Sequence, residues 1–208
     1  MTGEHSTIIA AHANVALEGL GFRRGGRSRL WIADHQSWLN VVEFTPNRWT
    51  IGISLVNAVH WLWAGTGFLA FDVGRQSNTH AEFETSEQFT SVVAKIVREA
   101  ASTAAELRDQ FSSFDRTADF VIDRARSSPD RMQPSWWGYQ AGIASALVGK
   151  FDDAAFFLRG ITDERVSIHS ALLLPLINSS DKFKSRVSEL VNRQREALQL
   201  TPLEYPQF

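Results

Sequence analysis

The feature that most constrains the fold is a change of hydrophobic periodicity partway along the chain. Residues 49–55 alternate strictly between apolar side chains and small or polar ones, which is the pattern of a half-buried strand. From Ser86 onward, apolar residues instead recur every three or four positions, as they do on one face of a helix. A chain patterned in this way is predicted to belong to the α+β class, with a sheet followed by helices.

Further elements follow from the same two periodicities. A helix is expected at residues 6–20, followed by an antiparallel meander of about four strands, because the connections between successive strands are short. The strands are expected at residues 30–35, 38–44, 49–55 and 68–73, and the polar segment 75–80 is expected to be a loop. Helices are expected at residues 86–111, 115–126, 136–148, 152–158 and 183–200, and those after residue 129 are expected to form a C-terminal helical bundle.

The segment from Pro129 to Pro134 marks the expected internal boundary. We therefore expect residues 1–128 to form a helix and an antiparallel sheet, covered by the long helix that begins at Ser86. Residues 129–208 are expected to form a helical region packed on this first part.

Composition limits the chemistry available to the chain. There is no cysteine, which excludes disulfides, thiolate metal sites and a cysteine nucleophile, and which fits a cytoplasmic location. The formal net charge of -2 is close to neutral, so any contact with nucleic acid would have to be local. Residues 49–71 carry no charge, but their glycines and their alternation favour two strands and a loop over a membrane helix, so no membrane contact is expected.

Residues 8–73 carry a recognisable series of features. A helix ends in Leu20-Gly21-Phe22, a basic glycine-containing turn follows, and the strands after it contain Trp31, Val41–Phe44 and Ile51–Ile53. This series resembles a bacterial domain family of unknown function, in which a helix precedes a meander sheet and an apolar-Gly-Phe step leads into a basic turn. The resemblance implies the fold of this part and, by analogy, a role in bacterial immunity or defence. It carries over no catalytic residue.

A second resemblance lies between residues 138 and 161. The spacing of small and aromatic residues there is similar to one tetratricopeptide helix pair, in which small residues let two helices cross closely. The residues concerned are Gly142, Gly149, Phe151 and Ala154. Gly138 stands where that family has a tryptophan, and a single pair cannot stack into a solenoid. We therefore favour a tightly packed helical hairpin here over a repeat-type binding groove.

The turn after the first helix is the first candidate binding feature. Its arginines could grip phosphates or an acidic protein partner, and neighbouring tryptophans could stack on unpaired bases. The residues are Arg23, Arg24, Arg27, Arg29, Trp31 and Trp38. The spacing of these two tryptophans is also typical of a strand core.

The remaining tryptophans are the second candidate. Trp136 and Trp137 cannot both point inward on one helix, so at least one is expected near the surface, where it could contact a partner. Trp49 belongs to the apolar face of an alternating strand and is expected in the core. Trp61 and Trp63 share one face if their strand continues past residue 60, or lie in a loop if it does not.

Histidines and carboxylates of the first half are the third candidate, this time for catalysis. The histidines have none of the close spacings that metal sites use, and no nucleotide-binding or serine-nucleophile motif occurs, so no metal, cofactor or catalytic residue is assigned. For the chain to be an enzyme, several of the following side chains would have to meet in one pocket: Asp34, His35, His60, Asp72 and His80.

Three functions from different classes are therefore considered. We favour a non-enzymatic binding module with a protein partner, which acts through the arginine-rich turn and its tryptophans or through Trp136 and Trp137. One alternative is an enzyme that uses the histidine and carboxylate groups of the sheet region. The other alternative is nucleic-acid binding through residues 23–29.

Overall fold

The computed structural model describes residues 3–26, 28–46, 52–127, 136–206 and 208. The chain forms two compact units, one of residues 1–60 and 70–109 and the other of residues 61–69 and 110–208. The boundary expected after residue 128 falls outside the described residues. Helix α3 (Phe114–Ser127), which the sequence placed before that boundary, belongs to the second unit.

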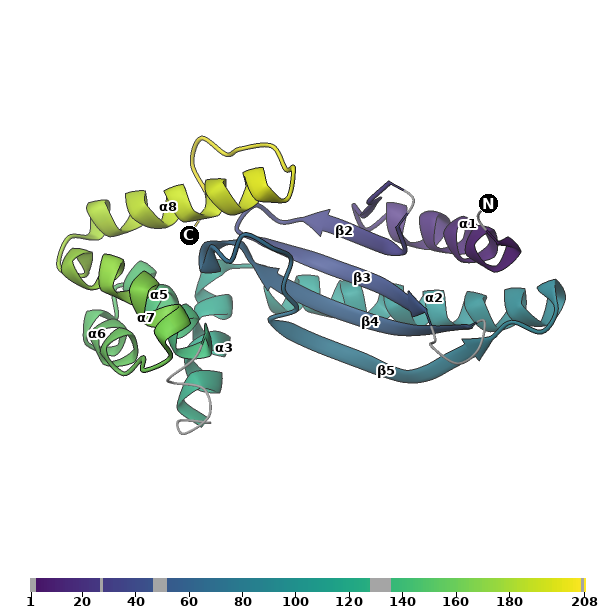
Figure 1. Cartoon of the computed structure of the whole chain (residues 1–208), viewed down its shortest axis with the longest axis horizontal. Helices are drawn as coiled ribbons and strands as arrows, with labels where there is room; N and C mark the ends of the chain where they lie inside the picture. Colours follow the sequence, from purple (N-terminus) through teal and green to yellow (C-terminus); the bar gives the residue numbers. More distant parts are fainter. Residues whose placement is uncertain (1–2, 27, 47–51, 128–135, 207) are drawn as a thin grey trace. The chain divides into compact units, whose positions relative to one another are not determined.

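The first unit contains a helix, a sheet and a second, long helix (Figure 1), and together with the helices that follow it confirms the predicted α+β class. Its elements are α1 (Glu4–Glu18), β1 (Arg23–Arg24), β2 (Leu30–Asp34), β3 (Trp38–Pro46), β4 (Gly52–Trp61), β5 (Val73–Glu82) and α2 (Ser86–Gln110). The strands lie in the order β1-β2-β3-β4-β5, so each one neighbours the next along the chain. The pairings of β1 with β2, β2 with β3 and β4 with β5 are antiparallel, as expected of a meander.

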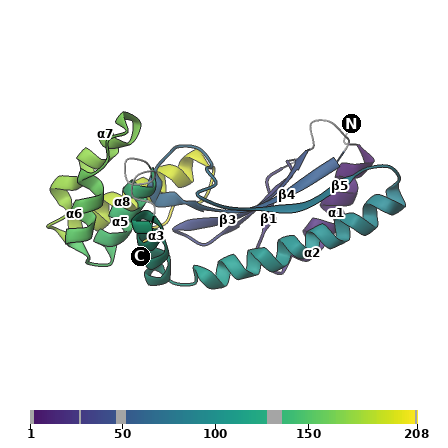
Figure 2. The same ribbon diagram turned by 90° about the horizontal axis from the view of Figure 1, so that it is seen from below.

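One face of this sheet forms the core of the first unit. Side chains alternate along a strand, so Trp31 and its partner Val42 point to one face, and Ile53 and its partner Ala81 point to the same face. Helices α1 and α2 pack on this face, and Figure 2 shows α2 running along the sheet. Their buried residues recur with helical spacing: Ile9, Ala13 and Leu17 in α1, and Phe89, Val93, Ile96, Ala100 and Ala104 in α2.

The last strand differs from the sequence prediction. A strand was expected at residues 68–73 and a loop at residues 75–80, but β5 covers Val73–Glu82 and the apolar segment before it lies in a connection. Within that connection, the side chains of Phe68 and Phe71 are 61% and 39% exposed. The prediction was wrong because an apolar run was taken for a strand and a polar run for a loop.

The polar side chains of β5 have partners that the sequence does not reveal. Arg75 forms an ion pair with Glu106 of α2 at 2.9 Å between Nη1 and Oε2. The Thr79 hydroxyl donates a hydrogen bond of 3.0 Å to Glu99, also in α2. The helix-facing side of β5 therefore meets polar groups of α2, and the strand needs no apolar stripe to be held there.

The second unit is helical apart from the end of β4. After α3 it contains α5 (Trp136–Leu147), α6 (Phe151–Arg159), α7 (Glu164–Leu173) and α8 (Ser180–Ala197), with 3-10 turns η1 (Leu62–Ala64) and η2 (Leu174–Leu176). The predicted helices are present, with ends that differ by a few residues. Across the part of the chain that is described, no helix is both long enough and apolar enough to cross a membrane.

An aromatic cluster forms part of the core of this unit. Trp61 and Trp63 stack on each other, with 4.9 Å between ring centroids and 16° between ring planes. Both side chains are fully buried. Phe111 meets the Trp61 ring edge-on at 5.1 Å, and Phe114 meets the Trp63 ring edge-on at 5.4 Å. Residues 61–64 therefore anchor the second unit.

The loop that follows η1 is tied to α8 by one buried amide. The Gln194 side chain accepts a hydrogen bond of 2.6 Å from the backbone N–H of Gly67 and donates one of 2.8 Å to the backbone oxygen of Phe68. Gln194 is 0% exposed, so its amide is shielded from water although the loop that it holds is exposed.

Helices α5 and α6 form a tightly packed hairpin. A Cβ atom added to Gly142 would lie 2.6 Å from Cγ of Leu158 and 3.5 Å from the backbone oxygen of Ala154. Only glycine allows this crossing without displacing Leu158. At the turn between the helices, Gly149 has φ of +78°, a conformation that side chains other than glycine rarely adopt.

We expect Gly142→Leu to lower the free energy of unfolding by about 1–3 kcal/mol, because the added side chain overpacks the α5–α6 crossing. The measurement is urea denaturation followed by circular dichroism. Gly19→Leu is the matched control, since nothing lies within 4 Å of its added Cβ. Equal midpoints for the two variants would contradict the close crossing.

Candidate functional site

Two of the three described arginines of the first turn bond within the fold, and the third is exposed. Arg23 is exposed on β1, whereas the Arg24 guanidinium lies over the ring of Trp31, with 5.2 Å from Cζ to the ring centroid. Arg24 also donates a hydrogen bond of 2.7 Å from Nε to the backbone oxygen of Ser28. Arg24 is therefore held against its own turn.

Arg29 is turned toward the start of α1. Its Nη2 donates a hydrogen bond of 3.1 Å to the Ser6 hydroxyl and lies 2.8 Å from Nε2 of His5. Burial, and then the positive charge of Arg24, lower the pKa of Arg29 from its ordinary value. Arg27 lies outside the described residues. The structure thus ties Arg24 and Arg29 to the fold of the first unit, whereas Arg23 is exposed.

Trp31 and Trp38, the tryptophans beside this turn, are buried. Trp31 is 1% exposed, and its indole N–H donates a hydrogen bond of 2.9 Å to the side-chain oxygen of Asn14. Trp38 is 5% exposed, and its ring stacks with that of His35 at 4.1 Å between centroids. Neither offers an open ring face for a nucleic-acid base.

Of the five residues considered for catalysis, Asp34 and His35 are adjacent in the chain, and His60 and Asp72 form a second close pair. His60 is fully buried, and its Nδ1 lies 3.1 Å from a carboxylate oxygen of Asp72 and 3.3 Å from the backbone nitrogen of Ala70. His80 pairs with Ser54, six residues before His60 in β4, which corresponds to about 20 Å along the strand. The two histidines therefore do not share a site. Among the described residues, no group of three potential metal-ligating side chains lies close enough to hold a metal ion.

A more developed site lies in the second unit, where α5, α7, α8 and the loop after η1 enclose a pocket of about 150 Å³. On α8, Arg186, Leu190 and Arg193 recur at spacings of four and three residues, so all three face the pocket. Gly65 forms another wall; its φ is +64°, and an added Cβ would lie only 3.2 Å from Leu190. The pocket thus depends on a glycine at this turn.

An aromatic group borders the pocket. The rings of Tyr139 and His169 both line it, with 6.0 Å between their centroids. Trp136 packs beside both of them, edge-on to Tyr139 at 5.7 Å and tilted against His169 at 5.5 Å. This is where the structure places Trp136, one of the predicted binding residues. Its neighbour Trp137 instead lies under Arg124, with 4.6 Å from Cζ to the ring centroid.

The pocket has hydrogen-bonding groups and an excess of positive charge. Tyr139 is 1% exposed, and burial raises the pKa of its hydroxyl well above the ordinary value, so the group stays protonated. Burial, and then the charge of Arg193, lower the pKa of His169. Arg186 forms an ion pair of 2.6 Å with Glu189. Within the described ranges Arg193 has no ion pair, and no acidic residue lines the pocket.

The rim of the pocket is apolar. Ile168 and Leu172, one helical turn apart on α7, line the pocket and are 63% and 57% exposed. The opposite side of α7 is docked through Val166, Leu173 and Ser170, whose hydroxyl donates a hydrogen bond of 2.6 Å to the backbone oxygen of Leu158. The docking of α7 therefore leaves these two apolar side chains facing outward.

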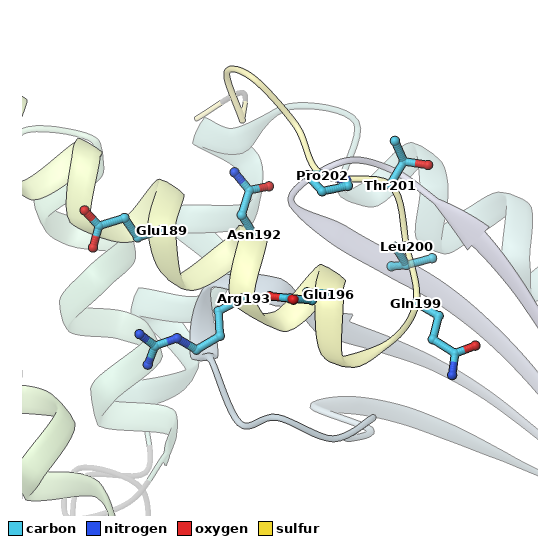
Figure 3. Close-up of a pocket in the computed structure, with 8 residues that line it drawn as sticks. All are labelled: Glu189, Asn192, Arg193, Glu196, Gln199, Leu200, Thr201 and Pro202. Atoms are coloured by element: carbon cyan, nitrogen blue, oxygen red, sulfur yellow. The ribbon is translucent and has the colours of Figure 1, made fainter.

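A shallower groove adjoins this pocket on α8. Figure 3 shows Glu189, Asn192, Arg193 and Glu196 on the helix and the tail residues from Gln199 to Pro202 beside it. Asn192 holds the tail through hydrogen bonds of 2.8 Å to the backbone oxygen and nitrogen of Leu203. Arg193 lines both the groove and the pocket, and its side chain points away from the tail (Figure 3).

We expect the ring of His169 to titrate below the ordinary pKa of about 6.5, and Arg193→Gln to move its midpoint upward, because a neighbouring positive charge is removed. The measurement is the pH titration of its ring protons by nuclear magnetic resonance. A lowered folded-state pKa also means that the unfolded chain takes up this proton first, so the stability linked to His169 is present above about pH 6.5 and is lost as the pH falls. An unchanged midpoint in Arg193→Gln would contradict the assigned cause.

Sequence reasoning singled out Trp136 but missed the four polar side chains that line the pocket: Tyr139, His169, Arg186 and Arg193. The sequence contained weak signals for two of these residues, because the chain has only two tyrosines and His169 is its only histidine after residue 80. The pocket itself depends on contacts between α5, α7, α8 and Gly65, which lie far apart in the sequence.

Comparisons with known proteins supply no assignment. No protein-family model, no curated protein and no solved structure matches this chain at a significant level.

Proposed function

We propose that the chain is a non-enzymatic binding module whose second unit holds a segment of a partner protein. The observation that carries this proposal is the pocket beside Trp136, Tyr139 and His169, together with its exposed apolar rim on α7. Aromatic side chains, arginine and a desolvated pocket are the usual components of the strongest contacts in protein interfaces.

The size of the pocket favours a protein segment over a small organic ligand. Its volume of about 150 Å³ is smaller than the roughly 300–1,000 Å³ of typical ligand pockets, so it suits one side chain. Ile168 and Leu172 extend the contact beyond the pocket, because they offer apolar surface to residues next to the anchoring side chain. A short peptide segment with one anchor residue fits both features.

The alternatives have less support. Arg24 and Arg29 bond within the first unit, and Trp31 is buried, which weakens nucleic-acid binding through the turn. An enzyme of the sheet region lacks the convergence of His60 with His80. The resemblance of residues 8–73 adds a setting for the partner, namely bacterial immunity or defence, and this part of the proposal rests on that resemblance alone.

The test is a selection of random displayed peptides against the immobilised whole chain. We expect enriched peptides whose affinity falls about tenfold or more in Leu172→Asp, because a charge replaces apolar contact area at the rim. Val15→Asp is the matched control, since Val15 is an exposed apolar residue of α1 in the first unit. Absence of enrichment over a blank surface would overturn the proposal, as would peptides that bind Leu172→Asp and the unmodified chain equally well.

A further inference from the structure

The charge of the pocket indicates the chemistry of the group that enters it. Two arginines and one histidine line it, and no carboxylate among the described residues does. Of the two arginines that line the pocket, Arg186 forms an ion pair with Glu189, whereas Arg193 forms none in the described part of the chain. The pocket therefore contains one arginine that is able to pair with an incoming anion.

The hydrogen-bonding groups point the same way. The Tyr139 side chain is almost wholly buried, lines the pocket and has no hydrogen-bond partner among the described residues. Because its hydroxyl stays protonated, it can donate to an acceptor. Arg193 can donate through its guanidinium fork. Neutral His169 can also donate through one ring nitrogen, so the polar side of the pocket is rich in donors.

The rest of the lining limits how large and how charged the occupant can be. Leu173, Leu190 and the rim residues of α7 are apolar, which suits a short methylene stem. One arginine without an ion pair among the described residues matches a singly charged carboxylate better than a doubly charged phosphate group.

We infer that the pocket binds the carboxylate of an aspartate or glutamate side chain in the partner segment, through Arg193 and the Tyr139 hydroxyl. The inference rests on the proposed function for the source of the carboxylate. The methylene stem of this acidic residue contacts Leu190, and apolar residues beside it contact Ile168 and Leu172. The partner segment is therefore acidic at one position and apolar at its neighbours.

The experiment is a titration of the isotope-labelled whole chain with a blocked amino acid, N-acetylglutamate amide, followed through the ring resonances of His169 and the methyl resonances of Leu172. We expect saturable shifts with a dissociation constant on the order of millimolar, since a single residue supplies few contacts. N-acetylglutamine amide, which has the same shape without the charge, is expected to bind about tenfold more weakly or worse. Inorganic phosphate is expected to bind more weakly than the glutamate compound.

Variants assign the contacts. Arg193→Gln and Tyr139→Phe are each expected to weaken binding of the glutamate compound, Arg193→Gln by about tenfold. Arg159→Gln is the matched control, because Arg159 is an exposed arginine at the end of α6 that does not line the pocket. Circular dichroism confirms that each variant folds. Equal binding of the glutamate and glutamine compounds would overturn the inference, as would undiminished binding in Arg193→Gln or tighter binding of phosphate.

Failure of this inference is distinguishable from failure of the proposed function. If the selected peptides contain no acidic residue but their binding still depends on Leu172, the proposed binding module is supported and the carboxylate inference is contradicted. If the glutamate compound binds saturably but no peptide is enriched, anion binding in the pocket is supported and the proposal of a protein partner is contradicted.

Discussion

Trp31→Ala is expected to lower the free energy of unfolding by about 3–5 kcal/mol, the usual result of removing a large aromatic side chain from a core. The Trp31 ring is 1% exposed and lies edge-on to Phe44 at 5.3 Å between centroids. Its loss also leaves the side-chain oxygen of Asn14 without its hydrogen-bond donor. The measurement is urea denaturation at neutral pH.

The same variant decides between two roles for Trp31. The sequence alone allowed a surface role in stacking on a base, which would predict lost binding with unchanged stability. The structure predicts the reverse, a large loss of stability. Trp31→Phe is the matched variant: it keeps an aromatic ring in the core and is expected to lose less than Trp31→Ala. Stability unchanged in Trp31→Ala would contradict the position of Trp31 in the core.

Trp63→Ala is expected to have an effect of similar size, about 3–5 kcal/mol, in the second unit. Trp63 is fully buried and stacks on Trp61, and Phe114 packs edge-on against it. Trp137→Ala provides the comparison, because Trp137 is only half-buried and its described ring contact is the cation–π contact with Arg124. That variant is expected to lose about 1 kcal/mol. Similar losses in both variants would show that the stacked pair does not anchor the unit.

Periodicity alone was enough to predict much of the fold. In the strand from Leu30 to Asp34 the buried residues alternate with less buried ones, and the long helix that begins at Ser86 carries an apolar stripe that matches its burial. Such stripes are visible in the sequence because burial against a neighbouring layer selects apolar residues at regular spacing.

Strand β5 and its preceding connection show where this reasoning stops. The helix-facing residues Arg75 and Thr79 of β5 are polar because they pair with glutamates of α2. The apolar Phe68 lies in a connection held by the amide of Gln194, far along the chain. Both arrangements depend on partners distant in sequence, so local pattern predicted the opposite state for each segment.

The binding site shows the same limit at the level of function. The arginine-rich turn was conspicuous because its charges are adjacent in sequence, yet Arg24 and Arg29 bond within the fold. Arg186 and Arg193 are separated by other residues of α8 in the sequence. They form a site only in the folded chain, where they line one pocket with Tyr139 and His169. A functional residue that depends on tertiary contacts leaves little trace in local spacing.

The most direct test of the central claim is a crystal structure of the whole chain with the tightest-binding selected peptide. We expect the peptide to lie on α7 and α8, with an acidic carboxylate about 2.7–2.9 Å from the guanidinium of Arg193. We also expect contact between neighbouring apolar residues of the peptide and Leu172. A peptide bound at another surface, such as the turn that carries Arg23, with the pocket beside Tyr139 free of it, would contradict the account.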